Sequence, residues 1–152
     1  MGMESKYIWM NGELVEFAKA TLHFLTPALH YGAGVFEGLR CYATDRGRAV
    51  FRPKEHLERL LDSARVFGFR ELPYSVAELT DAIRLVVTAN GFNECYIRPL
   101  LYLTDGGWNL TVDAGRASVA LPCGSGTTIW APKRWRTASA PTSPHSRATI
   151  RM

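Results

Sequence analysis

The alternation of apolar and polar residues near the start of the chain predicts two β-hairpins. The segment YIWMNGELVEF places apolar and aromatic residues on both sides of Asn11-Gly12, a dipeptide that readily adopts the positive φ angles of a two-residue turn. The segment VFEGLRCYATDRGRAVFR repeats this pattern, with the longer connection TDRG between two strand-like runs. The fold is therefore expected to open with four strands.

Two amphipathic helices are predicted after these strands. Pro53 stands where a helix favours its first residue, and apolar residues follow at helical spacing over about 53–67. Ser75 and Glu78 have the spacing of a capping box, and the second helix is expected to end near Gly91. The residues expected to form the buried stripes are Leu57, Leu60, Leu61, Ala64 and Phe67, then Leu79, Ile83, Val86 and Val87.

The remaining apolar runs complete the prediction of an α+β fold. CYIRPLLYLTD and ASVAL are rich in aromatic and aliphatic residues typical of strands, and Pro99 must lie at a bulge or an edge because it has no amide proton. Strands and helices are segregated along the chain rather than alternating. This order favours a mixed, largely antiparallel sheet carrying two helices over a parallel βαβ fold.

The distribution of charge divides the chain after residue 121. The net charge is +4, but residues 122–152 hold five Lys and Arg and no acidic residue, so residues 1–121 are close to neutral. This tail also holds four of the eight prolines and shows no apolar periodicity. Such a composition does not offset the entropy cost of ordering. We expect one domain over 1–121 and a disordered tail over 122–152.

Several classes of protein are disfavoured by composition. No run approaches the roughly 18 apolar residues of a membrane helix, and the N-terminus lacks a signal region, so we expect a cytoplasmic protein with no membrane partner. Cys41, Cys95 and Cys123 are far apart and odd in number, and the four histidines show no ligand spacing, so we expect free thiols and no metal. The basic tail has no folded scaffold, and we expect no nucleic-acid partner.

Three clusters of residues could carry chemistry. The stretch LHYGAGVFEGLRCY contains three glycines, but its spacing differs from the dinucleotide-binding fingerprint, and turns or close backbone approach explain it equally well. Arg59 lies beside the apolar stripe of its helix, where it could bind an anion or pair with Glu55 or Asp62. Tyr96 and Arg98 share one face of a strand, where they could hold a carboxylate or pack together on the surface.

Four of these segments together resemble the class IV (fold-type IV) pyridoxal-phosphate aminotransferases, and specifically the branched-chain amino acid aminotransferases. They are YIWMNGELV, HYGAGVFEGLRCY, FRPKEHLERLLDSA and YIRPLLYLTDGGWNL, which follow the family's order over nearly all of residues 6–120. The resemblance implies the small N-terminal domain of that fold and pyridoxal 5′-phosphate as cofactor. It also implies exchange of the amino group between Leu, Ile or Val and 2-oxoglutarate, in a homo-oligomer that is a dimer or larger.

The resemblance also implies roles for particular residues. Arg59 would bind the cofactor phosphate, Tyr96 the substrate carboxylate, and Arg98 the side-chain carboxylate of glutamate. The residues that would form the pocket for aliphatic side chains are Tyr31, Phe36 and Gly38, with Leu110 completing the pocket of the neighbouring subunit.

The lysine that holds the cofactor in this family has no counterpart here. None of Lys6, Lys19, Lys54 or Lys133 stands in a matching context, because that lysine belongs to a second domain beyond the point where the resemblance stops. The resemblance therefore implies an enzyme whose second, lysine-bearing domain is absent from this sequence, and a chain that is inactive by itself.

The tail sequence indicates how the resemblance is lost. After ASVAL the family continues with an apolar residue, Trp, any residue, Trp, two variable positions and Tyr-Leu-Gly, whereas this chain reads PCGSGTTIWAP. Codons read one base earlier, from the last base of the Pro122 codon, permit Leu-Trp-Glu-Trp-Asp-Asp-Tyr-Leu-Gly. The Trp130-Ala131 junction forces the final Gly. We interpret 122–152 as a frameshift-like tail.

Two alternatives remain open at this point. A D-amino acid aminotransferase or an aminodeoxychorismate lyase would share the fold, although YIRPL and GVFEGLRCY are more similar to the branched-chain enzymes. The other alternative is a non-catalytic module that dimerises with a complete subunit and modulates it. A substrate panel would test the first, and co-purification with a complete subunit would test the second.

Overall fold

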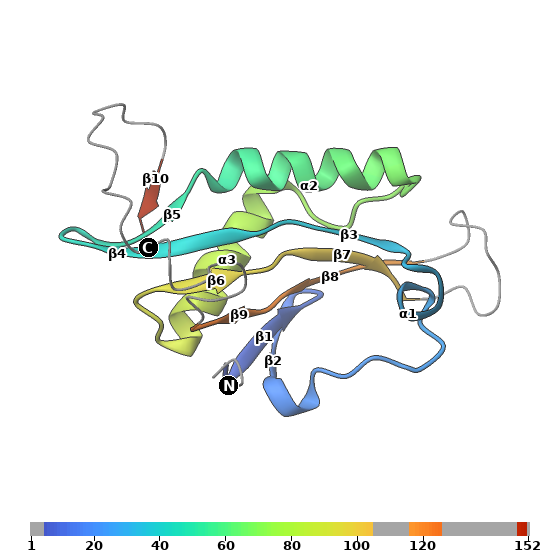
Figure 1. The fold of residues 1–152 in the computed structure, drawn as a ribbon, viewed down its shortest axis with the longest axis horizontal. Coiled ribbons are helices and arrows are strands. Elements are labelled where there is room, and N and C mark those ends of the chain that lie inside the picture. Colours follow the sequence, from blue (N-terminus) through green and yellow to red (C-terminus); the bar gives the residue numbers. More distant parts are fainter. Residues whose placement is uncertain (1–4, 105–115, 126–148, 152) are drawn as a thin grey trace, which may run out of the picture.

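The computed structural model describes residues 5–104, 116–125 and 149–151, which form two five-stranded sheets and several helices (Figure 1). The first sheet has the order β2 (Glu13–Glu16), β1 (Tyr7–Met10), β8 (Ala117–Leu121), β7 (Leu100–Leu103) and β3 (Gly34–Phe36). The second has the order β10 (Thr149–Arg151), β5 (Gly47–Phe51), β4 (Leu39–Thr44), β6 (Cys95–Ile97) and β9 (Cys123–Gly124). Every strand pairing among the described residues is antiparallel.

Both predicted hairpins are confirmed. Strands β1 and β2 pair across Asn11 and Gly12, whose φ angles of 48° and 102° are those that this turn requires. Strands β4 and β5 pair across the turn that ends at Gly47 (φ 106°). Local turn chemistry thus sets the register of both pairs.

Two strand-like runs change sheets midway. The run that begins at Val35 leaves the first sheet after Phe36 and enters the second at Leu39, and the run from Cys95 to Leu103 divides in the same way at Pro99. Pro99 therefore lies where a strand passes between sheets rather than at a sheet edge. Two backbone hydrogen bonds cross these breaks, from Glu37 N–H to Pro99 O and from Arg98 N–H to Pro122 O, each 3.0 Å. In Figure 1, β4 continues into β3 and β6 into β7.

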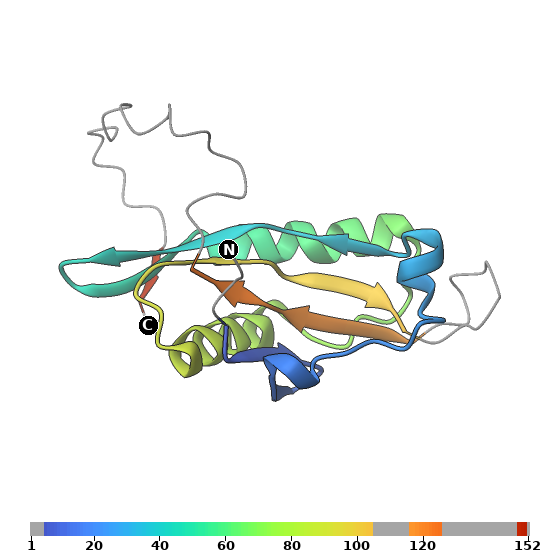
Figure 2. The same cartoon turned by 60° about the horizontal axis from the view of Figure 1, so that its bottom comes forward.

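Both long helices are confirmed. Helix α2 (Pro53–Phe67) begins with proline and ends at Gly68 in the left-handed conformation, and α3 (Val76–Asn90) carries the predicted Ser75–Glu78 capping box. A short helix, α1 (Pro27–Tyr31), and a 3₁₀ turn (Phe17–Lys19) were not predicted. The two long helices pack against each other as well as against the strands, and Figure 2 shows both beside the sheets. The core that they share with the sheets includes Leu57, Leu60, Ile83, Val86, Ile97, Leu101 and Leu121.

These features confirm the α+β class and a largely antiparallel arrangement, although the strands form two sheets and not one. The sheet pairing continues past residue 121, since Cys123 and Gly124 pair with β6. Residues 126–148 and 152 lie outside the described residues, so the predicted disorder of that part of the tail stays a prediction. Within the described ranges, no helix combines the length and apolar character needed to cross a membrane.

The three cysteines are free and buried, as predicted. Cys41 and Cys95 are directly opposite each other on β4 and β6. The contact with Cys123, together with burial, raises the pKa of Cys95 to about 12. The part of the chain that the structure describes contains no group of three or more His, Cys, Asp or Glu side chains suited to a metal ion.

Candidate functional site

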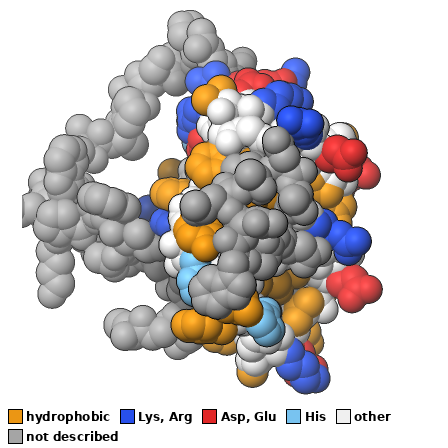
Figure 3. Space-filling view, turned by 90° about the vertical axis from the view of Figure 1, so that its right-hand side faces the viewer, with side chains coloured by type: hydrophobic (Ala, Val, Ile, Leu, Met, Phe, Trp, Pro, Cys, Tyr) orange, Lys and Arg blue, Asp and Glu red, His pale blue; other side chains and the backbone are white. Residues whose placement is uncertain are grey.

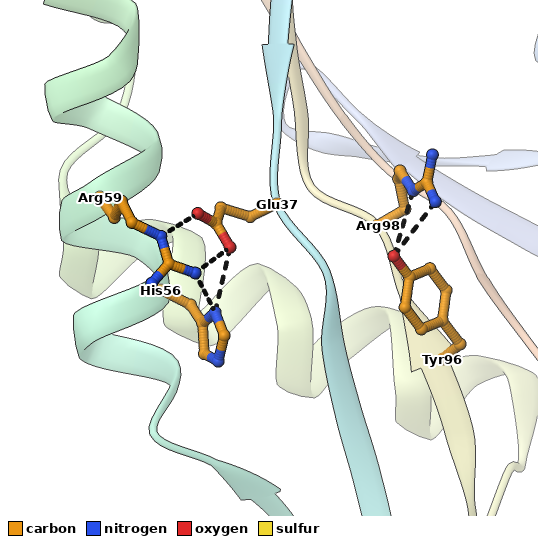
Figure 4. A network of polar contacts seen from close by, with 5 residues as sticks. All are labelled: Glu37, His56, Arg59, Tyr96 and Arg98. Carbon is orange, nitrogen blue, oxygen red and sulfur yellow. Dashed lines mark hydrogen bonds and ion pairs between the residues drawn. The ribbon is translucent and has the colours of Figure 1, made fainter. Parts of the chain in front are cut away.

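Arg59 forms an ion pair with Glu37, which reaches α2 from the break between β3 and β4 (Figure 4). Its Nε donates to one carboxylate oxygen, and its Nη2 donates to the other at 2.7 Å. His56, one turn earlier on α2, has its Nδ1 3.1 Å from both Glu37 Oε2 and Arg59 Nη2. The result is a cluster of three side chains from two elements, which we call the Arg59 cluster.

The pairing partners of Arg59 differ from those considered in the sequence. Glu55 instead accepts from Arg52, and Asp62 accepts from Arg65, each at i,i+3 spacing. Both ion pairs lie along the helix surface, whereas Arg59 crosses to the segment between β3 and β4. The interpretation in which Arg59 pairs with Glu55 or Asp62 is therefore wrong, and the arginine meets a carboxylate that is 22 residues away in sequence.

Glu37 is the buried member of this pair. Its side chain is 11% exposed, against 62% for Arg59. Burial alone would raise the pKa of the Glu37 carboxyl, but hydrogen bonds from Arg59 and His56 outweigh that effect and hold the pKa below its ordinary value. The same hydrogen bond raises the pKa of Arg59. The pair is therefore ionised on both sides.

The Arg59 guanidinium retains donors for a further anion. Within the described ranges, no hydrogen bond uses its Nη1, while Nε and Nη2 are engaged by Glu37 and His56. A guanidinium with an exposed edge is the donor that phosphate and carboxylate groups accept from in pairs. The residues present thus fit the phosphate of a phosphorylated ligand.

Tyr96 and Arg98 form a second cluster, across the strand from Glu37 in Figure 4. Arg98 donates from Nε and Nη2 to the Tyr96 hydroxyl, at 3.3 Å and 3.2 Å, which confirms that the two side chains share a face. The Arg98 guanidinium also lies 4.7 Å from the centroid of the Phe36 ring. Tyr96, Arg98 and Phe36 together are called the Arg98 cluster below.

Gly38 connects the two clusters. It directly follows Glu37, and a Cβ atom built on it would overlap the Tyr96 hydroxyl and lie 3.2 Å from the ring carbon that bears it. Only glycine therefore leaves room for the phenol in its observed place. The segment Glu37–Gly38 thus carries the carboxylate of one cluster and the space required by the other.

Two aromatic residues expected at the site are exposed. Tyr31 on α1 is 41% exposed, and its ring lies near that of His30, which also contacts Phe24. Phe36, a member of the Arg98 cluster, is 60% exposed. In Figure 3, which faces the end that carries α1, exposed hydrophobic side chains lie among charged and His side chains. Leu110 lies outside the described residues.

Glu37 and His56 were missed as members of the site. Glu37 is a single acidic residue between two apolar runs, and this position could have pointed to it. A carboxylate that is largely buried needs a partner. His56 stands three residues before Arg59, on the same helix face, but its role depends on the strand that packs there.

The described residues thus combine antiparallel sheets and two long helices with two arginine clusters, one that leaves a guanidinium edge exposed and one that contains a tyrosine–arginine pair. The family model for amino-transferase class IV matches residues 34–150. The chain therefore belongs to the class IV aminotransferases.

Several relatives that are named branched-chain-amino-acid aminotransferases are similar to this chain. The branched-chain-amino-acid aminotransferase of Escherichia coli (strain K12) is 44% identical over 112 residues, covering 74% of this chain and 36% of that protein. The probable branched-chain-amino-acid aminotransferase of Rickettsia typhi is 37% identical over 147 residues, covering 91% of this chain and 49% of that protein. The chain thus spans less than half the length of these relatives.

Solved structures show the same likeness. The branched-chain amino acid aminotransferase of Escherichia coli superimposes with a TM-score of 0.75 at 40% identity, covering 79% of this chain and 40% of that one. The T.th. branched-chain amino acid aminotransferase complexed with N-(5′-phosphopyridoxyl)-L-glutamate gives a TM-score of 0.73 at 42% identity, covering 81% of this chain and 41% of that one. The described fold therefore matches the first part of these enzymes.

Proposed function

We propose that this chain forms the cofactor-phosphate and substrate-recognition part of a branched-chain amino acid aminotransferase. The reaction would exchange an amino group between Leu, Ile or Val and 2-oxoglutarate, with pyridoxal 5′-phosphate as cofactor. The observation that carries the proposal is the pairing of the two clusters, because one offers a guanidinium edge and the other a phenol and a second guanidinium. The similarity to the T.th. enzyme, complexed with a molecule that has phosphate and glutamate portions, supports it.

In this proposal Arg59 binds the cofactor phosphate through its Nη1 edge. The edge is held by the Glu37 and His56 contacts, and 62% exposure of the side chain leaves it open to a ligand. The bound cofactor supplies the electron sink that amino-group transfer needs. The task of Arg59 is to orient that cofactor, and not to move protons.

The Arg98 cluster would bind the two carboxylates of glutamate through different side chains. The Tyr96 hydroxyl donates a hydrogen bond to the substrate carboxylate, and Arg98 binds the side-chain carboxylate of glutamate. For an aliphatic substrate, Arg98 stays over the face of Phe36, where the ring offsets part of the lost hydration of the cation. Tyr31, Phe36 and Gly38 then line the pocket for the aliphatic side chain, and Leu110 completes the pocket of a neighbouring subunit.

A homo-oligomer is part of the same proposal. Phe24, Leu29 and Tyr31 lie on α1 or just before it and are between 41% and 75% exposed, and the rings of Phe24 and Tyr31 both lie near that of His30. Apolar groups gathered on one exposed face mark an interaction surface more often than an isolated one does. A second copy packed there would bring its own rim residues to the site.

We further propose that the lysine-bearing part of the enzyme is encoded in another frame of the same gene. Beyond Tyr-Leu-Gly, the frame that starts at the Pro122 codon permits Ala-Glu-Ala-Leu-Glu-Asn-Gly-Val, a run rich in helix-forming residues. The Arg134-Trp135 junction forces Leu, Val or Met in that frame. The 152-residue chain by itself is then expected to catalyse no transamination.

The test compares two products of the gene. The 152-residue chain and a version whose frame changes at the Pro122 codon are assayed for amino transfer to 2-oxoglutarate from L-leucine, L-isoleucine, L-valine and D-alanine. We expect activity with the three branched-chain donors from the frame-changed product alone, and its loss in the Arg59→Ala variant. Preference for D-alanine would favour the D-amino acid aminotransferase alternative, and no activity from either product would contradict the proposal.

A further inference from the structure

Glu37 accepts hydrogen bonds from two of the five N–H bonds of the Arg59 guanidinium, and a third N–H lies beside His56. The Nε–H and one Nη2–H point to the two carboxylate oxygens, and Nη2 also lies 3.1 Å from His56 Nδ1. The two N–H bonds of Nη1 remain, and no hydrogen bond within the described part of the chain uses them. The carboxylate thus occupies one edge of the guanidinium and leaves the opposite edge free.

The carboxylate is the fixed member of the pair. The backbone N–H of Glu37 donates to Pro99 O at 3.0 Å, and the Gly38 N–H also stabilises the charged carboxylate. The Glu37 side chain is 11% exposed, whereas the Arg59 side chain is 62% exposed and would otherwise sample many rotamers. An exposed arginine is therefore held by a buried acid, and not the reverse.

We propose that Glu37 is a positioning residue for Arg59, which it fixes so that the Nη1 edge faces the cofactor phosphate. This inference rests on the proposed function, because the phosphate is that of the proposed cofactor. A long side chain that is already ordered loses less entropy when a ligand binds. Glu37 touches neither phosphate nor substrate in this account and acts through Arg59.

A competing role for Glu37 makes the opposite prediction. In that role, the Glu37 carboxylate occupies the phosphate-binding edge of Arg59, and the ligand has to displace it. The position of the carboxylate on the Nε–Nη2 edge favours positioning, since an anion can approach Nη1 without breaking either contact. The two roles differ in whether the Glu37–Arg59 pair survives when the ligand binds.

The first experiment uses the full 152-residue chain without substitutions. The Arg59 Nε–H resonance is assigned by its disappearance in the Arg59→Lys variant, and its exchange with water is followed by NMR. Inorganic phosphate, pyridoxamine 5′-phosphate and pyridoxamine are then added separately. Positioning predicts a slowly exchanging Nε–H that persists when the two phosphate-bearing probes bind. Faster exchange on binding would show displacement of Glu37 and overturn the inference.

The second experiment measures how strongly the chain prefers pyridoxamine 5′-phosphate over pyridoxamine. Glu37→Gln keeps the shape of the side chain but replaces one accepting oxygen with a donor. We expect fast exchange of the Arg59 Nε–H in this variant and a phosphate preference about tenfold lower, since an ordered side chain binds at a smaller entropy cost. Glu55→Gln is the matched control, because Glu55 pairs with Arg52 on the same helix, and it should leave both readouts unchanged.

A double-mutant cycle separates positioning from a structural effect. If Glu37 acts through Arg59, Glu37→Gln lowers the phosphate preference no further when Arg59 is already Lys. An equal loss in both backgrounds, or a higher preference in Glu37→Gln, would overturn the inference. Unchanged Nε–H exchange in Glu37→Gln would also overturn it, with or without a ligand. A chain whose Nε–H is protected but which shows no phosphate preference would contradict the proposed function instead.

Discussion

The two arginines of the site are held by different chemistry. Arg59 is bound by a buried carboxylate through two charge-assisted hydrogen bonds, whereas Arg98 is bound by a neutral phenol and by the face of an aromatic ring. Both sets of bonds have a charged donor, but the Arg59 pair joins two opposite charges, with one contact at 2.7 Å, whereas the Arg98 bonds reach an uncharged oxygen at 3.2 Å and 3.3 Å. The comparison indicates a fixed cation beside one that can move, as expected where one ligand group is constant and the other changes between substrates.

The largest loss of stability is expected at Arg59, the arginine held by a carboxylate. Glu37→Ala leaves the Arg59 cation without its carboxylate, and hydrogen bonds to charged groups contribute about 1.5–3 kcal/mol. We expect urea unfolding to show a stability loss of about 2–3 kcal/mol. Glu55→Ala removes a half-exposed i,i+3 partner of Arg52 and should cost about 1 kcal/mol or less. Equal losses in the two variants would contradict the difference that we draw between buried and surface pairs.

The stability contributed by Glu37 should also depend on pH. Because its pKa in the folded chain lies below the ordinary value of 4.5, its contribution is full above that value and is lost as the pH falls through the lowered pKa. We expect the stability difference between the unsubstituted chain and Glu37→Gln to be largest near pH 7 and to shrink in strong acid. The measurement is urea unfolding of both proteins from about pH 7 to about pH 3. A stability difference that grows as the pH falls would contradict a lowered Glu37 pKa.

Gly38 connects the Arg59 cluster with the Arg98 cluster. A methyl group there meets the Tyr96 hydroxyl, so Gly38→Ala should displace the phenol from Arg98 and cost about 1–2 kcal/mol. Gly32→Ala is a useful comparison, because Gly32 has open space but a φ of 63°. NMR should show altered Tyr96 ring resonances in the first variant only. Unchanged Tyr96 resonances in Gly38→Ala would refute the contact.

The smallest loss of stability is expected at Arg98. Arg98→Lys keeps the charge but loses the planar group that lies over Phe36 and the paired donors to Tyr96. We expect a stability loss of about 0.5–1 kcal/mol, comparable with one exposed cation–π contact. In the frame-changed enzyme, the same substitution should raise KM for glutamate more than KM for leucine. A loss as large as that of Glu37→Ala would remove the contrast between the two arginines.

Local sequence signals predicted much of the fold. Asn11-Gly12 and the Ser75–Glu78 capping box act within a few residues of themselves, so the first hairpin and both long helices were found with their bounds. The sheet changes at Glu37–Gly38 and Pro99 were not found, because each depends on where the neighbouring strand runs. The two sheets were accordingly predicted as one.

The site was predicted only where sequence spacing sufficed. Tyr96 and Arg98 are two residues apart on one strand, and alternation alone placed them together. The partner of Arg59 is 22 residues away, and only the packing of α2 on the strands brings Glu37 to it. Helical spacing pointed to Glu55 and Asp62 instead, which pair with nearer arginines.

The most direct test uses N-(5′-phosphopyridoxyl)-L-glutamate, which carries a phosphate and the two carboxylates of glutamate in one molecule. The full chain is titrated with it, and the side-chain resonances of Arg59, Tyr96 and Arg98 are followed by NMR. The account predicts that all three respond with one affinity, and that Arg59→Lys and Arg98→Lys each weaken it. Responses at one cluster alone, or a response that both variants leave unchanged, would contradict the claim that the clusters form one site.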